Sequence, residues 1–156
     1  MKRDQNGVLR FESTDGLQVG NKIIHIASDR EVTIHTIHGV VKDHLDVCSE
    51  HSSVETWIDV QEFAPIPLTI ERAKSMLEAK GFECKTLTYS VVFKQDCKST
   101  DYIEVYMNGF MSFDLINYDF KNEKFDLRFS GQIQGVPIQY IHELQNFIQL
   151  LTGDRI

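Results

Sequence analysis

The first sixty-four residues carry short runs in which apolar and polar side chains alternate. After Gly16, the segment LQVGNKIIHIA holds two apolar stretches around Gly20-Asn21, a pair that favours a tight turn. The run EVTIHTI alternates, and GVVKDHLDV and VETWIDV follow it. About five short strands in sixty residues predict a small SH3-like β-barrel over residues 1–64.

The pattern changes at Pro65, one of two prolines in Ala64-Pro65-Ile66-Pro67 that restrict the backbone and cannot donate ladder hydrogen bonds. A helical period then predicts a helix over 70–80. Thr69 is a good N-cap, Gly81 stands where a left-handed residue ends a helix, and Phe82 is placed to pack back.

Long alternating runs follow this helix and predict four antiparallel strands. They are LTYSVVF, IEVYM, FMSFDLINYDF and KFDLRF, and Asn108-Gly109 between the second and third is a strong hairpin signal. With the final helix, they predict an α-β4-α domain over residues 65–156, in which both helices cover one face of an antiparallel sheet. The expected fold class is therefore α+β.

The last helix has an unusual polar face. Its apolar arc holds Tyr140, Leu144, Phe147, Ile148 and Leu151, and the opposite side holds His142, Gln145, Asn146 and Gln149. Amides and an imidazole form hydrogen bonds without net charge, so they tolerate dehydration better than Lys or Glu. We expect another subunit, the N-terminal half or a ligand to cover this face, with an ordinary solvated surface as the alternative.

Two tyrosines mark a second candidate surface. Tyr102 and Tyr106 share the strand face opposite Ile103 and Val105, and Arg128 is expected on the same face of the sheet. Three interpretations stay open for the tyrosines: simple surface residues, an oligomer or domain contact, and a platform that stacks on a ligand base.

Charge and composition narrow the class of protein. The net charge of -7 argues against nucleic-acid binding, which needs clustered Lys and Arg. No apolar leader or membrane-length run is present, and three widely spaced cysteines fit reduced thiols. We therefore expect a cytoplasmic protein without membrane attachment.

No cofactor, catalytic or metal signature is predicted. The segment HTIHGVVKDHLDVCSEH holds five potential ligands with spacings too irregular for a tetrahedral zinc site, namely His35, His38, His44, Cys48 and His51. Nothing in the sequence brings Cys84 or Cys97 beside His142 as a nucleophile and base. The carboxylates Glu104, Asp114, Asp119 and Asp126 are expected to point to solvent, with an acid/base pair as the alternative.

Several segments together resemble a group of uncharacterised small proteins of Bacteroidota phages and mobile elements. They are LQVGN at 17–21, PIPLT at 65–69, Gly81-Phe82, and above all YIHELQN at 140–146 with Leu-Thr-Gly at 151–153. The resemblance implies an accessory protein in a bacterial host cytosol.

We expect a non-catalytic, homo-oligomeric binding protein, in its sharpest form an anti-defence protein that sequesters a nucleotide-like signalling molecule. A structural or protein-interaction accessory without a small ligand, and a metal- or Cys-dependent enzyme, are the alternatives.

Overall fold

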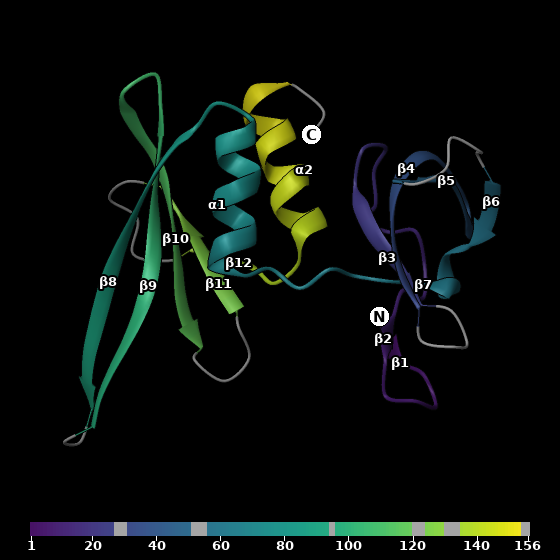
Figure 1. Cartoon of the computed structure of the whole chain (residues 1–156), viewed down its shortest axis with the longest axis horizontal. Coiled ribbons are helices and arrows are strands. Elements are labelled where there is room, and N and C mark those ends of the chain that lie inside the picture. The colour runs from purple at the N-terminus through teal and green to yellow at the C-terminus, as the bar shows by residue number, and fades with distance from the viewer. Residues whose placement is uncertain (27–30, 51–55, 94–95, 120–123, 130–134, 154–156) are drawn as a thin grey trace. The chain divides into compact units, whose positions relative to one another are not determined.

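The computed structural model describes residues 1–26, 31–50, 56–93, 96–119, 124–129 and 135–153, without the side chains of Tyr89, 91–100, Met111 and 117–119. These ranges contain two α-helices and twelve strands, and the strands form three antiparallel sheets. The fold is therefore mixed α and β, as expected (Figure 1).

The chain divides into two compact units. One joins Met1–Pro67 to Tyr140–Ile156, and the other is Leu68–Gln139. The chain returns to the first unit next to the point where it leaves it. There, Pro67 forms a β-bridge with Tyr140, and the Ile141 N–H donates to Ile66 O at 2.9 Å. The last helix, expected in a domain over 65–156, is therefore grouped with the N-terminal strands.

The N-terminal unit contains a five-stranded curled sheet and a small hairpin. The sheet has the order β6-β5-β4-β3-β7 and is a curled half-barrel, in which the terminal strands β6 and β7 are not paired with each other where the structure describes them. Its strands are β3 (Lys22–Ile26), β4 (Val32–Val41), β5 (His44–Ser49), β6 (Thr56–Asp59) and β7 (Phe63–Ala64). The hairpin is β1 (Lys2–Arg3) with β2 (Leu9–Arg10), and a 3-10 turn, η1 (Val60–Glu62), precedes β7.

Two of the expected strands differ from the observed ones. The runs EVTIHTI and GVV belong to one strand, β4, whose pairing with β5 shifts at a bulge between Ile37 and Gly39. A Cβ on Gly39 would lie 3.1 Å from the Trp57 ring and 3.2 Å from the Asp46 Cβ, so the glycine lets neighbouring strands approach there. The stretch before Gly20 is not a strand, and only β3 follows the turn.

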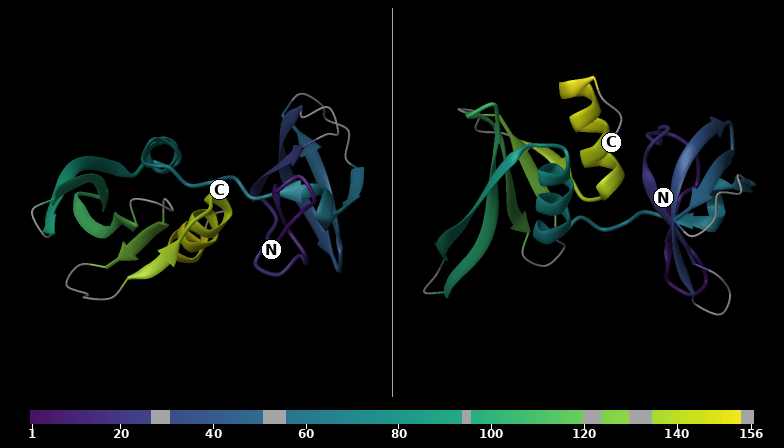
Figure 2. Two further views of the ribbon diagram at one scale, coloured as in Figure 1. Left: turned by 90° about the horizontal axis from the view of Figure 1, so that it is seen from below. Right: turned by 45° about the horizontal axis from the view of Figure 1, so that its top comes forward.

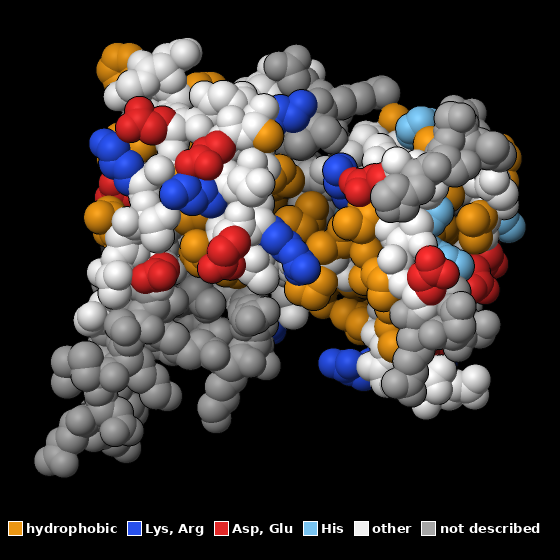
Figure 3. Space-filling view, in the orientation of Figure 1, with side chains coloured by type: hydrophobic (Ala, Val, Ile, Leu, Met, Phe, Trp, Pro, Cys, Tyr) orange, Lys and Arg blue, Asp and Glu red, His pale blue; other side chains and the backbone are white. Residues whose placement is uncertain are grey.

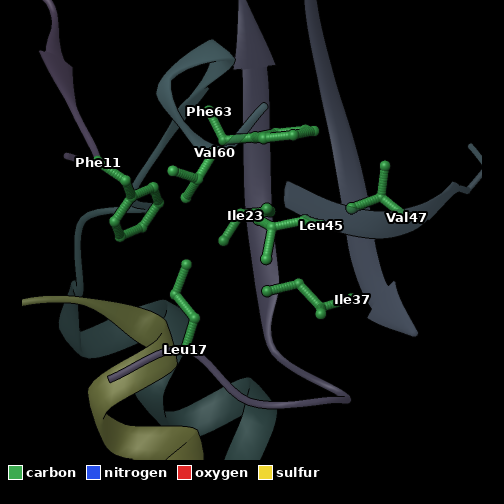
Figure 4. Packing of buried hydrophobic residues seen from close by; sticks show 8 residues of the cluster. All are labelled: Phe11, Leu17, Ile23, Ile37, Leu45, Val47, Val60 and Phe63. Atoms are coloured by element: carbon green, nitrogen blue, oxygen red, sulfur yellow. The ribbon is translucent and has the colours of Figure 1, made fainter. Parts of the chain in front are cut away.

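The core of this unit lies inside the curl. Figure 4 shows its eight buried side chains, which come from the strands, η1 and the two loop positions 11 and 17: Phe11, Leu17, Ile23, Ile37, Leu45, Val47, Val60 and Phe63. Each is 6% exposed or less, so this sheet buries one face even though the barrel is incomplete.

The second unit begins with α1 (Ile70–Ala79), whose ends match the sequence prediction. The Thr69 side chain accepts from the Arg72 N–H at 3.2 Å. At the other end, Gly81 has φ +85°, its N–H donates to Glu78 O, and Phe82 N–H donates to Leu77 O. This pair of bonds is a Schellman motif, and Phe82 is 5% exposed.

A five-stranded meander completes this unit, in the order β12-β11-β10-β9-β8. The strands are β8 (Glu83–Phe93), β9 (Asp96–Met107), β10 (Phe110–Asp119), β11 (Lys124–Arg128) and β12 (Val136–Ile138). Asn108 (φ 53°) and Gly109 (φ 81°) make the predicted hairpin between β9 and β10. The fifth strand, β12, was not predicted, and Pro137 fits it because β12 lies at the sheet edge.

One face of the meander is apolar, and α1 lies beside β8 and β9 (Figures 1 and 2). The Phe82 and Phe113 rings meet edge to face at 6.4 Å, and Ile103, Val105 and Leu115 are fully buried. Because strand side chains alternate, the neighbours of these residues lie on the other side of the sheet, which we call the open face.

Candidate functional site: the polar helix contact and the open sheet face

The polar side of α2 (Ile141–Thr152) contacts the loop that leads into β3. Asn146 forms hydrogen bonds at both ends of its amide: its Oδ1 accepts from Asn21 Nδ2 at 2.9 Å, and its Nδ2 donates to Gly16 O at 2.6 Å. Asn21 is itself 2% exposed. Both ends of this amide are therefore paired inside the N-terminal unit.

Gln145 makes the same kind of contact one residue earlier. Its Oε1 accepts from the Lys22 backbone N–H at 2.9 Å, and its Nε2 lies 3.4 Å from Gly20 O. The side chain is 3% exposed. An amide serves here because it donates and accepts at once, and it satisfies both the Gly20 carbonyl and the N–H of Lys22, the first residue of β3.

His142 is buried among aromatic rings. Its ring meets Phe11 edge to face at 5.4 Å and stacks on Tyr140 at 5.8 Å, and it is 5% exposed. Burial lowers the pKa of His142 below its ordinary value, while the nearby Glu143 carboxylate acts in the opposite direction. The imidazole is therefore neutral at physiological pH and belongs to the packing of the unit.

These contacts account for the amides of the polar helix face, whereas the buried His142 Nδ1 has no hydrogen-bond partner among the described residues. The N-terminal half of the same chain covers His142, Gln145 and Asn146, while Gln149 is half-buried one turn further along. The helix begins where Glu143 accepts from the Tyr140 N–H at 3.0 Å and ends at Gly153 with φ 73°. On the apolar arc, Leu144 and Ile148 are buried, but Leu151 is 37% exposed.

The open face of the meander carries four charged side chains at directly opposite positions of consecutive strands. Lys85 on β8 pairs with Glu104 on β9, Glu104 with Asp114 on β10, and Asp114 with Arg128 on β11. We call these four residues the charged row. Cross-strand partners have Cβ atoms about 5 Å apart, so two carboxylates lie side by side between two cations.

A tyrosine flanks the charged row on each side. Tyr106 donates its hydroxyl to Glu104 Oε2 at 2.8 Å, and Lys85 Nζ lies 4.4 Å from the centre of its ring. Tyr102 occupies the next row, between Leu87 and Ile116. Both tyrosines are half-buried, and Leu87 is 39% exposed. The structure thus brings Tyr102, Tyr106 and Arg128 to one face, together with acidic neighbours.

Asp114 lies in the middle of the charged row. Its Oδ1 is buried and has no hydrogen-bond partner among the residues that the structure describes, and the same holds for the Nε atom of Arg128 opposite it. Burial raises the pKa of Asp114 above its ordinary value, the Glu104 charge raises it further, and Arg128 lowers it. An N–H donor from outside the chain would relieve this carboxylate.

Gly135 lies against β11, next to Arg128 at the end of the charged row. A Cβ at this position would lie 2.9 Å from the Asp126 Cβ, 2.9 Å from Leu127 O and 3.0 Å from the Arg128 Cγ. The backbone at Gly135 therefore packs directly against the outward side chains of β11, which only glycine permits. Asp126 is half-buried, with its Oδ2 3.8 Å from an Arg128 nitrogen, rather than freely solvated.

A shallow cleft of about 680 Å³ lies along the β1-β2 hairpin of the N-terminal unit, and sequence reasoning missed it. Arg10 bridges it, with Nε 3.1 Å from Asp4 Oδ2 and a guanidinium nitrogen donating to Glu62 O at 2.8 Å. Asp4 also accepts from the Asn6 and Val8 N–H groups. Because these charges are paired within the chain, the cleft is a weaker ligand site than the open face.

Four histidines and Cys48 lie on strands β3, β4 and β5 of the curled sheet. Figure 3 shows histidines gathered on this unit, where the His25, His35 and Phe63 rings meet edge to face. His38 and His44 are exposed, and His51 lies outside the described residues. In the described ranges, no three His, Cys, Asp or Glu side chains converge as metal ligands.

Among the described side chains, the free thiols are those of Cys48 and Cys84. Burial raises the pKa of Cys84 to about 11, with a further contribution from Glu78, so this thiol is protonated at neutral pH. The Cys48 thiol lies 3.5 Å from Ser49 O. The side chains of Cys97 and Asp119 lie outside the described residues.

Comparisons with protein-family models, curated proteins and solved structures returned no match to this chain. Among the helices that the structure describes, none is long and apolar enough to cross a membrane.

Proposed function

We propose that the chain is a non-catalytic binding protein that holds a small nucleotide-like molecule on the open face of the meander. The observation that carries the proposal is Asp114, whose buried Oδ1 lacks a donor among the described residues while Tyr102 and Tyr106 flank it on neighbouring rows. A base with ring N–H or amino donors would supply the missing hydrogen bonds and stack on a tyrosine.

The charges of the row support the same class of ligand. Glu104 and Asp114 together accept several N–H donors, as the Watson–Crick edge of guanine presents them. Arg128 and Lys85, at the two ends of the row, are placed to meet an anionic phosphate or carboxylate of the ligand. A molecule with both a donor-rich base and an anionic group matches this face better than a simple anion does.

The wider setting is part of the proposal. A binding protein of this kind fits an accessory role for a phage or mobile element in a bacterial host cytosol, where sequestering a nucleotide-like signal would counter host defence. We further propose that the curled half-barrel is a diverged SH3-like barrel whose role is to support α2.

Ligand titration tests the proposal. Calorimetry with guanosine, adenosine and cytidine monophosphates should show binding that favours guanosine, and Asp114→Asn should weaken that binding by about tenfold or more, because a charged acceptor is lost. Asp43→Asn, at an exposed turn of the other unit, is the matched control and should bind like the parent chain.

Mass spectrometry of small molecules that co-purify with the chain from cells with active nucleotide signalling extends the test to ligands outside this panel. Binding that is equal in Asp114→Asn and the parent chain would contradict the proposed site. No bound nucleotide in either experiment would favour an interaction accessory without a small ligand.

A further inference from the structure

The outer backbone edge of the long strand β8 is a surface that the proposed ligand face does not use, although the Lys85 side chain of this strand belongs to the charged row. The strand covers eleven residues, Glu83–Phe93, and it is the last strand in the order of its sheet. Glu83, 85–88 and Ser90 are all exposed along it. Its outward N–H and C=O groups therefore form an accessible template for another strand.

This edge lacks the features that normally prevent strand addition. Its pairing with β9 runs from Glu83↔Tyr106 to Phe93↔Asp96 without a register shift, so no bulge twists it away. It contains no proline, and Thr86–Phe93 carries no charge. The other edge of the same sheet, β12, has three residues and includes Pro137, and the edge strands β6 and β7 have four and two residues.

We propose that β8 pairs antiparallel with β8 of a second copy, around a two-fold axis at Thr88. In an antiparallel ladder, directly opposite residues are both hydrogen-bonded or both not. When a strand pairs with a second copy of itself, this condition requires the central residue to lie directly opposite its own copy. A register in which the centre falls between two successive residues does not meet the condition. Thr88 is the central residue of β8, so an axis there pairs all eleven positions.

The charges of the strand are compatible with this register. Glu83 lies opposite the partner's Phe93, and Lys85 opposite the partner's Val91, so no like charges meet across the interface. The contact is isologous, which closes at two copies and leaves no further β8 edge exposed. Self-pairing thus explains both the length and the uncharged centre of the strand, and a foreign strand has no comparable support.

Substitution at the axis is the first test, because it places two copies of the new side chain opposite each other. Thr88→Lys should raise the dimer dissociation constant by about tenfold or more through like-charge repulsion. Thr88→Val is the matched control: both variants remove the hydroxyl that lies 3.0 Å from Asp101 Oδ1, but only lysine adds charge. Analytical ultracentrifugation over a concentration series measures the change, with circular dichroism verifying that both variants are folded.

Cross-linking tests the register even if Thr88→Lys fails to fold. In a chain with Cys48, Cys84 and Cys97 replaced by serine, Thr88→Cys should form an intermolecular disulfide under mild oxidation, because opposite Cα atoms lie about 4.5–5.5 Å apart. Ser75→Cys, exposed on α1, should not form one.

A parent chain that stays monomeric at every concentration, equal association of the lysine and valine variants, or equal cross-linking at positions 75 and 88 would overturn the dimer. None of these outcomes bears on nucleotide binding, which is measured separately.

Discussion

The interpretation of His142 from the sequence differs from the role that its surroundings in the structure indicate. On a helical wheel it belongs to a polar face, and its type alone is compatible with a ligand contact, a metal ligand or a base. In the structure it lies between Phe11 and Tyr140 with a depressed pKa. The sequence identified the residue as unusual, but it could not show that Phe11, far away along the chain, packs against it.

Burial of His142 predicts a pH-dependent stability. Because the folded state disfavours the charged imidazole, the unfolded chain binds more protons near the ordinary pKa of 6.5. Stability is therefore full above this pH and falls as the pH decreases through the unfolded and then the folded pKa. Urea unfolding at several pH values should show this loss, and His142→Phe should reduce it while preserving the ring contacts.

Other groups contribute to the same pH range and define the control. The pKa of His35 is also lowered, by burial and then by the His25 charge, so a residual dependence should persist in His142→Phe. Ser75 is exposed and does not titrate, and Ser75→Ala should leave the parent profile unchanged. A profile that is identical in His142→Phe and the parent chain would show that His142 is not desolvated in solution.

At the scale of elements, local signals predicted best. The cap residue Thr69, Gly81 and the Asn108-Gly109 turn all matched, because each depends only on neighbouring backbone atoms. The bulge in β4 and the strand β12 were missed for the opposite reason. Gly39 packs closely against Trp57 on another strand, and β12 is a three-residue strand that pairs with β11.

For the candidate surfaces too, the sequence predicted the features that depend on local pattern and missed those that depend on tertiary pairing. Alternation placed Tyr102 and Tyr106 on one face, but the charged row depends on the register of four strands, and register comes from tertiary pairing. Similarly, the amide composition of α2 indicated a covered face, while the identity of the cover required Gly16, Gly20 and Asn21 to be placed.

The α2 contact gives a prediction at this scale. Gln145→Ala should lower the free energy of unfolding of the N-terminal unit by about 1–3 kcal/mol, because it leaves the Lys22 N–H without its acceptor in a part-buried contact. Gln149→Ala, on the same face but only half-buried, should stay within about 0.5 kcal/mol. Denaturant unfolding followed by Trp57 fluorescence separates the two, and equal effects would indicate that α2 is not docked through Gln145.

At the scale of the whole molecule, the N-terminal unit is built from both ends of the chain. Residues 1–67 supply the curled sheet and 140–153 supply α2, with the meander inserted between them. A division of the sequence at the proline-rich joint separates these two ends, because a linear pattern cannot show that the chain returns. The β-bridge of Pro67 with Tyr140 marks the place of return.

This arrangement predicts that a chain ending at Gln139 loses stability in its N-terminal unit, although every strand of that unit is still present. Without α2, the Phe11 ring loses its contact with His142, and Asn21 and Lys22 lose their amide partners. Several such losses sum to a few kcal/mol, a large fraction of the stability of a small unit.

Trp57 is the single tryptophan of the chain and lies on β6, so its fluorescence reports on the N-terminal unit alone. In the chain ending at Gln139, its transition should shift to lower urea concentration, and adding a peptide of residues 136–156 should move it back. Leu150→Ala in the full-length chain, at a side chain 83% exposed, is the control that keeps α2 and should not shift the transition. A truncated chain with the parent midpoint would mean that the curled sheet is stable without its helix, and that the amides of α2 serve some purpose other than holding it.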